Sequence, residues 1–212
     1  MTNPTYHEYY LIHHNKRLIK TTSCSIHLNK QKIKIQRALI SVFDKTGIVG
    51  LAESLNQHGV EIISTGGTAK TLGEAGLRVK GVSTYTGFPE IMDGRVKTIN
   101  PLVEGGILGL RDKHADDAKA NNIRWIDLVV CNLYPFSKMI SQADCDLMAA
   151  MDNVDIGGPT MIRSAAKNVG WVTVVVNPQD YQSIIDELDE FVEISFETRK
   201  KLSAKAFGHT AQ

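Results

Sequence analysis

A short turn at residues 65–68 (Thr-Gly-Gly-Thr) has the composition of an anion-binding segment. Gly66 and Gly67 allow an anion to approach the backbone, and a helix expected to follow would direct its free N–H groups and positive dipole end at that anion. Thr65 and Thr68 add hydroxyl donors, so a phosphate is the expected ligand. The alternative is a tight turn with no ligand, because Gly-Gly often only precedes a helix. The spacing matches neither a Walker loop nor a dinucleotide fingerprint.

Two further segments supply charged groups beside glycines. Residues 95–98 (Arg-Val-Lys-Thr) place two cations and a hydroxyl in a loop, and Lys45 is a third cation after an expected strand. These cations would form charge-assisted hydrogen bonds with a phosphate, although a solvated surface pair is the alternative. Asp155 precedes a Gly-Gly step and an expected helix, where a carboxylate serves either proton transfer or N-capping. Lys167 shares a face of that helix with Arg163, four residues earlier.

Strands that alternate with helices must position these groups. Short apolar runs predict strands at residues 38–43, 60–64, 78–82, 127–133 and 171–176, and apolar spacing predicts helices at 48–55, 68–75, 144–151, 158–167, 178–190 and 196–212. Residues 83–100 read as loop, followed by a short apolar segment at 105–110. This order predicts an α/β fold, a three-layer αβα sandwich around a mainly parallel sheet. Ser41–Lys45, Ser64–Thr68 and Asn132–Tyr134 follow three strands, so we expect one site at the carboxyl edge of the sheet.

The composition is that of a soluble globular chain. It has 212 residues, 42% hydrophobic and 22% charged, which excludes a wholly disordered, collagenous or disulfide-scaffold protein. The longest apolar runs are too short to span a bilayer, and the three cysteines lack Cys-x-x-Cys spacing, so a cytoplasmic location is expected. Residues 1–37 hold seven Lys or Arg against one Glu. We expect a disordered extension there, with weak anion binding as the alternative, and a single domain over residues 38–212. Neither a nucleic acid nor a membrane is an expected partner.

Six runs in this sequence resemble a known family. They are SVFDKTG (41–47), STGGTAK (64–70), TGFPEIMDGRVKT (86–98), CNLYPF (131–136), DIGGPTMIRSAAKN (155–168) and AFGHTA (206–211). Their identity and order resemble the IMP cyclohydrolase domain of the bifunctional purine-biosynthesis family, which combines AICAR formyltransferase with IMP cyclohydrolase. The resemblance covers residues 38–212.

The resemblance implies a methylglyoxal synthase-like fold and a homodimer. It also implies ring closure of 5-formamidoimidazole-4-carboxamide ribotide to IMP and water, without a metal or redox cofactor. The family continues into a formyltransferase domain that uses 10-formyltetrahydrofolate. This chain stops before that domain, so formyl transfer is not expected of it.

The resemblance also implies roles for individual residues. Lys167 matches the family's proton donor or acceptor, and Tyr134 matches a tyrosine beside the reacting base. From the chemistry of their side chains, we expect Asp155 to be a base or orienting group, and Lys97, Tyr134 and Asn132 to contact the oxyanion and the reacting base. The substrate-binding residues would be Ser41, Phe43, Asp44, Lys45, Ser64, Thr65, Gly66, Gly67, Thr68, Arg95, Val96, Thr98, Cys131, Ile156, Gly157 and Gly158. No metal ligand is implied.

Three positions depart from the family pattern. Phe43 stands where serine is frequent, and Asn100 and Glu104 stand where histidines are common. These departures concern the flanking loop contacts and leave residues 95–98 unchanged. Two other functions stay open: methylglyoxal synthase, which would need its own aspartate and histidine arrangement, and a non-catalytic nucleotide-sensing domain, which would need no Asp155/Lys167 pair.

Overall fold

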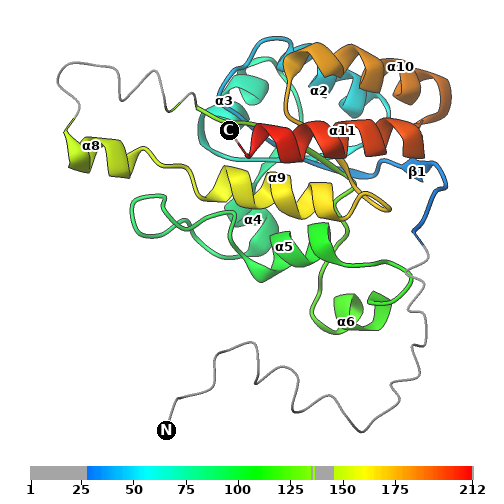
Figure 1. Cartoon of the computed structure of the whole chain (residues 1–212), viewed down its shortest axis with the longest axis horizontal. Helices are drawn as coiled ribbons and strands as arrows, with labels where there is room; N and C mark the ends of the chain where they lie inside the picture. Colours follow the sequence, from blue (N-terminus) through cyan, green and yellow to red (C-terminus); the bar gives the residue numbers. More distant parts are fainter. Residues whose placement is uncertain (1–27, 135, 137–145, 212) are drawn as a thin grey trace, which may run out of the picture.

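A five-stranded parallel sheet forms the centre of the molecule in the computed structural model, which describes residues 28–134, 136 and 146–211 (Figure 1). β2 (Arg37–Val42) is central and β5 (Leu128–Asn132) is buried along its whole length, as expected for strands covered on both faces. Ser41 pairs with Cys131 and Val42 with Asn132, so the carboxyl ends of β2 and β5 lie level. The spatial order is β4 (Val79–Gly81), β3 (Glu61–Ser64), β2 (Arg37–Val42), β5 (Leu128–Asn132) and β6 (Thr173–Val175).

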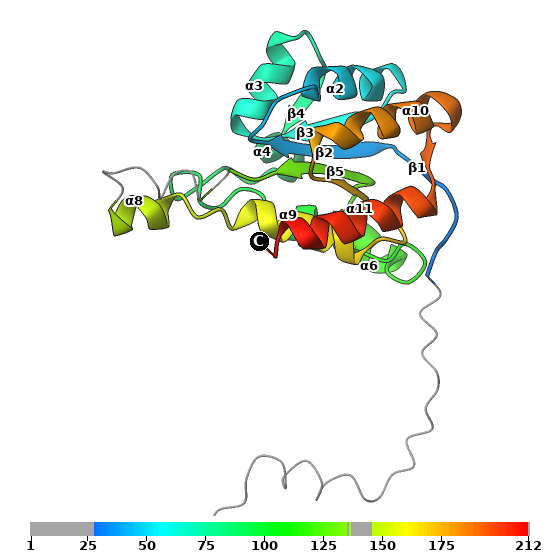
Figure 2. The same ribbon diagram turned by 45° about the horizontal axis from the view of Figure 1, so that its top comes forward.

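Helices cover both faces of the sheet, and the edge-on view of Figure 2 separates the three layers. One face carries α2 (Ile48–Gln57), α3 (Gly66–Glu74) and α10 (Tyr181–Phe191). The other carries α4 (Val82–Thr86), α5 (Pro101–Leu108), α9 (Gly157–Lys167) and α11 (Phe196–His209). Each face has its own cluster of buried apolar side chains. The expected three-layer α/β sandwich with a parallel sheet is confirmed.

Most elements lie where the apolar pattern placed them, with three differences. The apolar segment at 105–110 belongs largely to α5, because Asn100 caps that helix through the Leu102 N–H and Pro101 occupies its first turn. The stretch read as loop contains α4. The third difference is α6 (Ala115–Ala120), which the sequence did not predict. The short helix α8 (Leu147–Asp152) and the 3-10 turn η1 (Pro178–Asp180) lie on the helices predicted at 144–151 and 178–190, although residues 144 and 145 lie outside the described part.

The folded part of the chain begins before Ala38. β1 (Ile33–Lys34) pairs antiparallel with β7 (Glu193–Ile194), and Ile35 is 1% exposed in the core. The disordered extension expected over residues 1–37 therefore does not hold for residues 28–37, while residues 1–27 lie outside the described part. The sequence analysis missed β1 because a strand of two residues is too short to show the apolar–polar alternation of a strand.

A buried arginine holds this N-terminal segment to the body. Arg199 in α11 is 0% exposed and donates hydrogen bonds to the carbonyls of Gln31 (2.9 Å), Val169 (2.9 Å) and Ile194 (2.7 Å). Burial, with a smaller effect from Arg111, lowers the pKa of Arg199 to about 10, so it stays protonated at neutral pH. Its guanidinium satisfies carbonyls that the short strands leave unpaired.

Within the described residues, no helix has the length and apolar character needed to cross a membrane.

Candidate functional site

A cavity of about 700 Å³ opens at the carboxyl edge of the sheet, beside the β2–β5 pair. The strand order reverses there, because β3 and β4 lie on one side of β2, and β5 and β6 on the other. Ligands of open parallel sheets bind at such a switch point. Of the residues expected in the site, the structure brings together Ser41, Phe43, Lys45, Thr65, Gly66, Gly67, Thr68, Arg95, Lys97, Thr98, Cys131, Asn132, Tyr134, Asp155, Ile156, Gly157 and Gly158.

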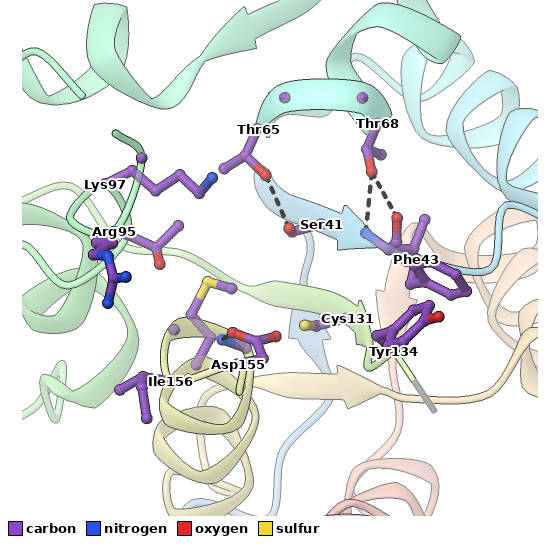
Figure 3. A pocket seen from close by; sticks show the side chains of 18 of the residues that line it. Ser41, Phe43, Thr65, Thr68, Arg95, Lys97, Cys131, Tyr134, Asp155 and Ile156 are labelled. Atoms are coloured by element: carbon purple, nitrogen blue, oxygen red, sulfur yellow. Dashed lines mark hydrogen bonds between the residues drawn. The ribbon is translucent and has the colours of Figure 1, made fainter. Parts of the chain in front are cut away.

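The glycine turn forms one wall of this cavity and is tied to β2 (Figure 3). Thr65 and Ser41 share a hydrogen bond of 2.9 Å. The buried Thr68 hydroxyl donates to the Val42 carbonyl (3.0 Å) and accepts from the Val42 N–H (3.1 Å). Thr68 therefore fixes the turn and is not the free donor that the sequence suggested. Gly66 and Gly67 are the first two residues of α3, so their N–H groups have no partner within the helix and this wall can donate hydrogen bonds to an anion.

Lys45 stands close to the same turn. Its Nζ donates to the carbonyls of Val42 (3.1 Å) and Phe43 (3.3 Å), and a Cβ built at Gly67 would lie 4.0 Å from that nitrogen. An ammonium group thus lies directly beside the N-terminus of α3. Both carry positive potential, and together they suit a phosphate better than a neutral group.

The loop before α5 supplies two further cations. Arg95 contacts Asp152 of α8 (2.5 Å), and Lys97 contacts Glu90 (3.4 Å). Figure 3 shows Lys97 extended toward Thr65. Arg95 and Lys97 keep 70% and 37% of their side chains exposed, so neither cation is enclosed by its partner.

Asn132 and Cys131 lie at the end of β5. The side chain of Asn132 is hydrogen-bonded to the backbone, and that of Cys131 is buried. The Asn132 amide accepts from the N–H groups of Phe43 (2.7 Å) and Asp44 (2.8 Å) and donates to the Asp44 carbonyl (2.9 Å). These bonds hold the turn after β2 and occupy the amide that the sequence suggested for the reacting base. Burial, with a smaller contribution from Asp155, raises the pKa of the Cys131 thiol to about 12, so it is not a nucleophile at neutral pH.

An aromatic pair closes the side of the cavity near the turn after β2. The rings of Phe43 and Tyr134 meet edge to face, with centroids 4.5 Å apart and an interplanar angle of 83°. Phe43 is 52% exposed and lines the cavity. The pair offers an apolar surface next to the polar turn.

The N-terminus of α9 forms the wall opposite the glycine turn. Asp155 Oδ1 accepts a hydrogen bond from the Gly158 N–H (2.9 Å), which is the capping role weighed from the sequence. A Cβ at Gly157 would lie 2.7 Å from the Thr98 hydroxyl, and one at Gly158 would collide with Asp155 and Leu133. The two glycines therefore leave room for the side chains of Asp155 and Thr98 at the helix start, where Asp155 faces the cavity (Figure 3).

Four of the expected site residues lie outside this cavity. Asp44 lines a neighbouring hollow, where hydrogen bonds from Thr46 lower the pKa of its carboxyl group. Ser64 donates to the Ile40 carbonyl and lines a small side cavity, and Val96 pairs with Ile91. Lys167 is the larger correction. It ends α9, about 15 Å along the helix from Gly157, and lines a different, smaller cavity. The predicted helix was correct, but its length separates Lys167 from the cavity.

Other lining residues were not anticipated from the sequence. Met161 follows Gly158 by three residues, so helical spacing placed it on the same face. The others are the last residue of β2, two residues of the turn before Arg95, and residues in and just after α8. The unanticipated set is Val42, Asp93, Gly94, Met151, Asp152, Val154 and Met161. It adds apolar side chains next to the charged wall.

Among the described residues, no cluster of three His, Cys, Asp or Glu side chains could hold a metal ion.

Comparison with known proteins gives the class to which this chain belongs. Residues 47–160 match the MGS-like domain family, and residues 165–212 match the family described as AICARFT/IMPCHase bienzyme. The solved structure described as "Crystal structure of ForH" superposes with a TM-score of 0.75 at 32% identity, covering 83% of this chain and 91% of that one. The chain therefore belongs to the MGS-like domain family.

Curated relatives of this chain are bifunctional purine biosynthesis proteins. The chain is 54% identical over 178 residues to the bifunctional purine biosynthesis protein PurH of Bacillus cereus (strain AH187), and 53% identical over 178 residues to that of Bacillus cytotoxicus. Each match covers 83% of this chain and 35% of the relative, so the chain spans about a third of the length of these proteins. It is homologous to the MGS-like IMP cyclohydrolase portion of the bifunctional family.

Proposed function

We propose that this chain closes 5-formamidoimidazole-4-carboxamide ribotide to IMP with loss of water. One observation carries the proposal: a phosphate-type turn, a lysine and a carboxylate, each from a different element, line one cavity. Thr65–Thr68 with Lys45 would hold the phosphate, and Lys97 and Asp155 would face the reacting groups. The homology to bifunctional purine-biosynthesis proteins supports the same substrate class.

The proposed reaction requires orientation more than assembly. The carboxamide nitrogen attacks the formyl carbon of the same molecule, a C–N bond forms, and the formyl oxygen gains negative charge. That oxygen leaves as water, with one proton from the carboxamide nitrogen and one from the formamide nitrogen. No electrons are exchanged with a second reactant, so the proposed chemistry needs no redox cofactor.

The side chains suit these steps. Lys97 offers an ammonium group to the developing oxyanion, and such preorganised charge is worth most in a site that excludes water. Asp155 would accept or orient the carboxamide proton. Lys167 has no place in this scheme within one chain, since it lies at the far end of α9. We propose that the protein works as a homodimer in the cytoplasm, with the ribonucleotide and IMP as its small-molecule partners.

The geometry disfavours methylglyoxal synthase chemistry. No histidine of the described residues lines the cavity of about 700 Å³. His58 pairs with Asp189 (2.9 Å), and His114 accepts from the Leu110 N–H (3.0 Å), both away from that cavity. A histidine-dependent elimination of phosphate therefore lacks its group at this site.

The test is IMP formation by the purified chain from the formylated ribotide, followed by ultraviolet absorbance. We expect turnover by the unaltered chain, and a loss in kcat/KM of about 10²- to 10³-fold in Lys97→Met, because an oxyanion contact is removed. Lys70→Met is the matched control, since Lys70 lies on the exposed face of α3 beside Glu74. IMP binding without any turnover would instead identify a nucleotide-sensing domain.

A further inference from the structure

The loop that presents Lys97 is closed by a single antiparallel bridge. The N–H of Ile91 donates to the Val96 carbonyl (3.2 Å), and the Val96 N–H donates back to Ile91 (3.4 Å). Met92, Asp93 and Gly94 turn the chain with φ values of 55°, 54° and 84°. The residues next outside this bridge are Glu90 and Lys97, so the turn places them opposite each other as a cross-strand pair.

Gly94 leaves room for the carboxylate of Glu90. A Cβ at Gly94 would lie 2.5 Å from Glu90 Oε1 and 3.7 Å from Lys97 Nζ. Any larger residue would displace the carboxylate from this place, and the positive φ also favours glycine. Glu90 Oε1 consequently reaches Lys97 Nζ at 3.4 Å over the open side of the turn.

The pair lies on the boundary between two hollows. Lys97 lines the main cavity and also the side cavity of about 90 Å³, whereas Glu90 lines only the side cavity. In the part of the chain that the structure describes, Glu90 is the carboxylate within ion-pair distance of Lys97. Lys97 therefore contributes to the walls of both cavities, and the carboxylate that contacts its ammonium group belongs to the side cavity.

We propose that Glu90 is a positioning residue that holds the ammonium group of Lys97 at this boundary. The inference builds on the proposed function, because the held charge is the one offered to the formyl oxygen. A lysine side chain is long and flexible, and its charge stabilises an oxyanion efficiently only when it is oriented in advance. Glu90 itself touches neither the main cavity nor, by this geometry, the substrate.

The position of Glu90 predicts an unusual kinetic signature for Glu90→Gln. Removing its charge frees Lys97, so kcat should fall by roughly tenfold through loss of orientation. The same change removes a negative charge beside an anion-binding wall, so KM and the Kd for IMP should stay the same or decrease. Glu74→Gln is the matched control, because it breaks an exposed Lys–Glu pair on α3 (3.8 Å) that lies outside both cavities.

The kinetic results for Glu90→Gln distinguish a positioning role of Glu90 from a role in folding. A fall in kcat with unchanged or lower KM, and with the control unaffected, supports the proposal. An unchanged kcat would overturn it, and so would a rise in KM accompanied by a lower melting temperature, because that pattern indicates a structural role. Glu90→Asp shortens the reach to Lys97 and should lower kcat by a smaller factor than glutamine does.

A spectroscopic readout separates this proposal from the proposed function. In chain labelled with ¹³C at the lysine Cε, the Lys97 signal is assigned by its loss in Lys97→Arg. We expect that signal to move on Glu90→Gln and to stay in place on Glu74→Gln, with and without IMP. A Lys97 signal insensitive to Glu90→Gln refutes the positioning role, even if the chain makes IMP. A chain that makes no IMP but shows the shift refutes only the proposed reaction.

Discussion

The two ends of the parallel sheet both gather basic side chains, but they use them differently. At the amino end, Glu61 lies among Arg37 (2.5 Å), Lys80 (2.8 Å) and Arg124 (3.4 Å). Asp127 is 2% exposed there and accepts from the N–H groups of Gln36 and Arg37 and from Arg111. The charges of this end satisfy one another and the backbone.

At the carboxyl end, the basic groups face a cavity. Lys45, Arg95 and Lys97 come from separate elements, and a space of about 700 Å³ lies between them. Their described partners are carbonyls or single carboxylates, which leaves donors for a ligand. This difference shows that a cluster of cations does not by itself indicate a binding site. A binding site is indicated where the hydrogen-bond donors of several cations face the same open cavity.

Arg199 of α11 is fully buried and bonds only backbone carbonyls, so its loss should have the largest effect on stability. Arg199→Met would leave the carbonyls of Gln31, Val169 and Ile194 without a donor, and we expect about 3–5 kcal/mol of destabilisation. Urea unfolding measures this loss. Lys200→Met, an exposed neighbour on α11, should change stability by less than about 0.5 kcal/mol. A loss below about 1 kcal/mol for Arg199→Met would show that water replaces the guanidinium.

Glu61 should have a smaller and pH-dependent effect. Burial raises the pKa of its carboxyl group, but hydrogen bonds from Lys80 and Arg37 outweigh this and lower it to about 2, against an ordinary value of 4.5. Its stabilising contribution is therefore complete above about pH 4.5 and is lost as the pH falls toward 2. At neutral pH we expect Glu61→Gln to cost about 1–2 kcal/mol, because the group is partly exposed.

Unfolding curves of both chains between pH 7 and pH 3 test this directly. The stability difference between the unaltered chain and Glu61→Gln should shrink as the pH falls. Glu53→Gln, an exposed change on α2, serves as the control. A difference that stays constant over this range would mean that packing, and not charge, accounts for the role of Glu61.

The smallest effect is expected at Lys167, which belongs to neither cluster. Lys45→Met should weaken IMP binding by roughly tenfold, since it removes a charged donor beside the glycine turn. Lys167→Met should change the Kd for IMP by less than about twofold, because Lys167 lies at the far end of α9. Calorimetric titration with IMP compares the two variants. Equal losses would contradict the assignment of the cavity.

Much of the fold was predictable because its signals are local. β-branched runs marked the parallel strands, and Pro178 correctly predicted the start of a helical segment, which begins as the turn η1 and continues as α10. The short pair β1–β7 was not predictable, because its stability comes from Arg199, far away in sequence. The α8 contribution to the cavity was also hidden, since none of its residues is buried in the chain.

The candidate site, like the fold, has features that the sequence predicts and features that depend on tertiary structure. The sequence by itself determined which chemical groups are available: the flexible glycine turn, the basic loop and the carboxylate before α9 are all properties of adjacent residues. Only the tertiary structure decided which of them meet. It occupied the Thr68 and Asn132 side chains with backbone bonds, separated Lys167 from Asp155 by the length of a helix, and set Glu90 against Lys97 across a turn. The reason is physical: composition fixes what a side chain can donate or accept, while distance and competition among donors depend on how the whole chain packs.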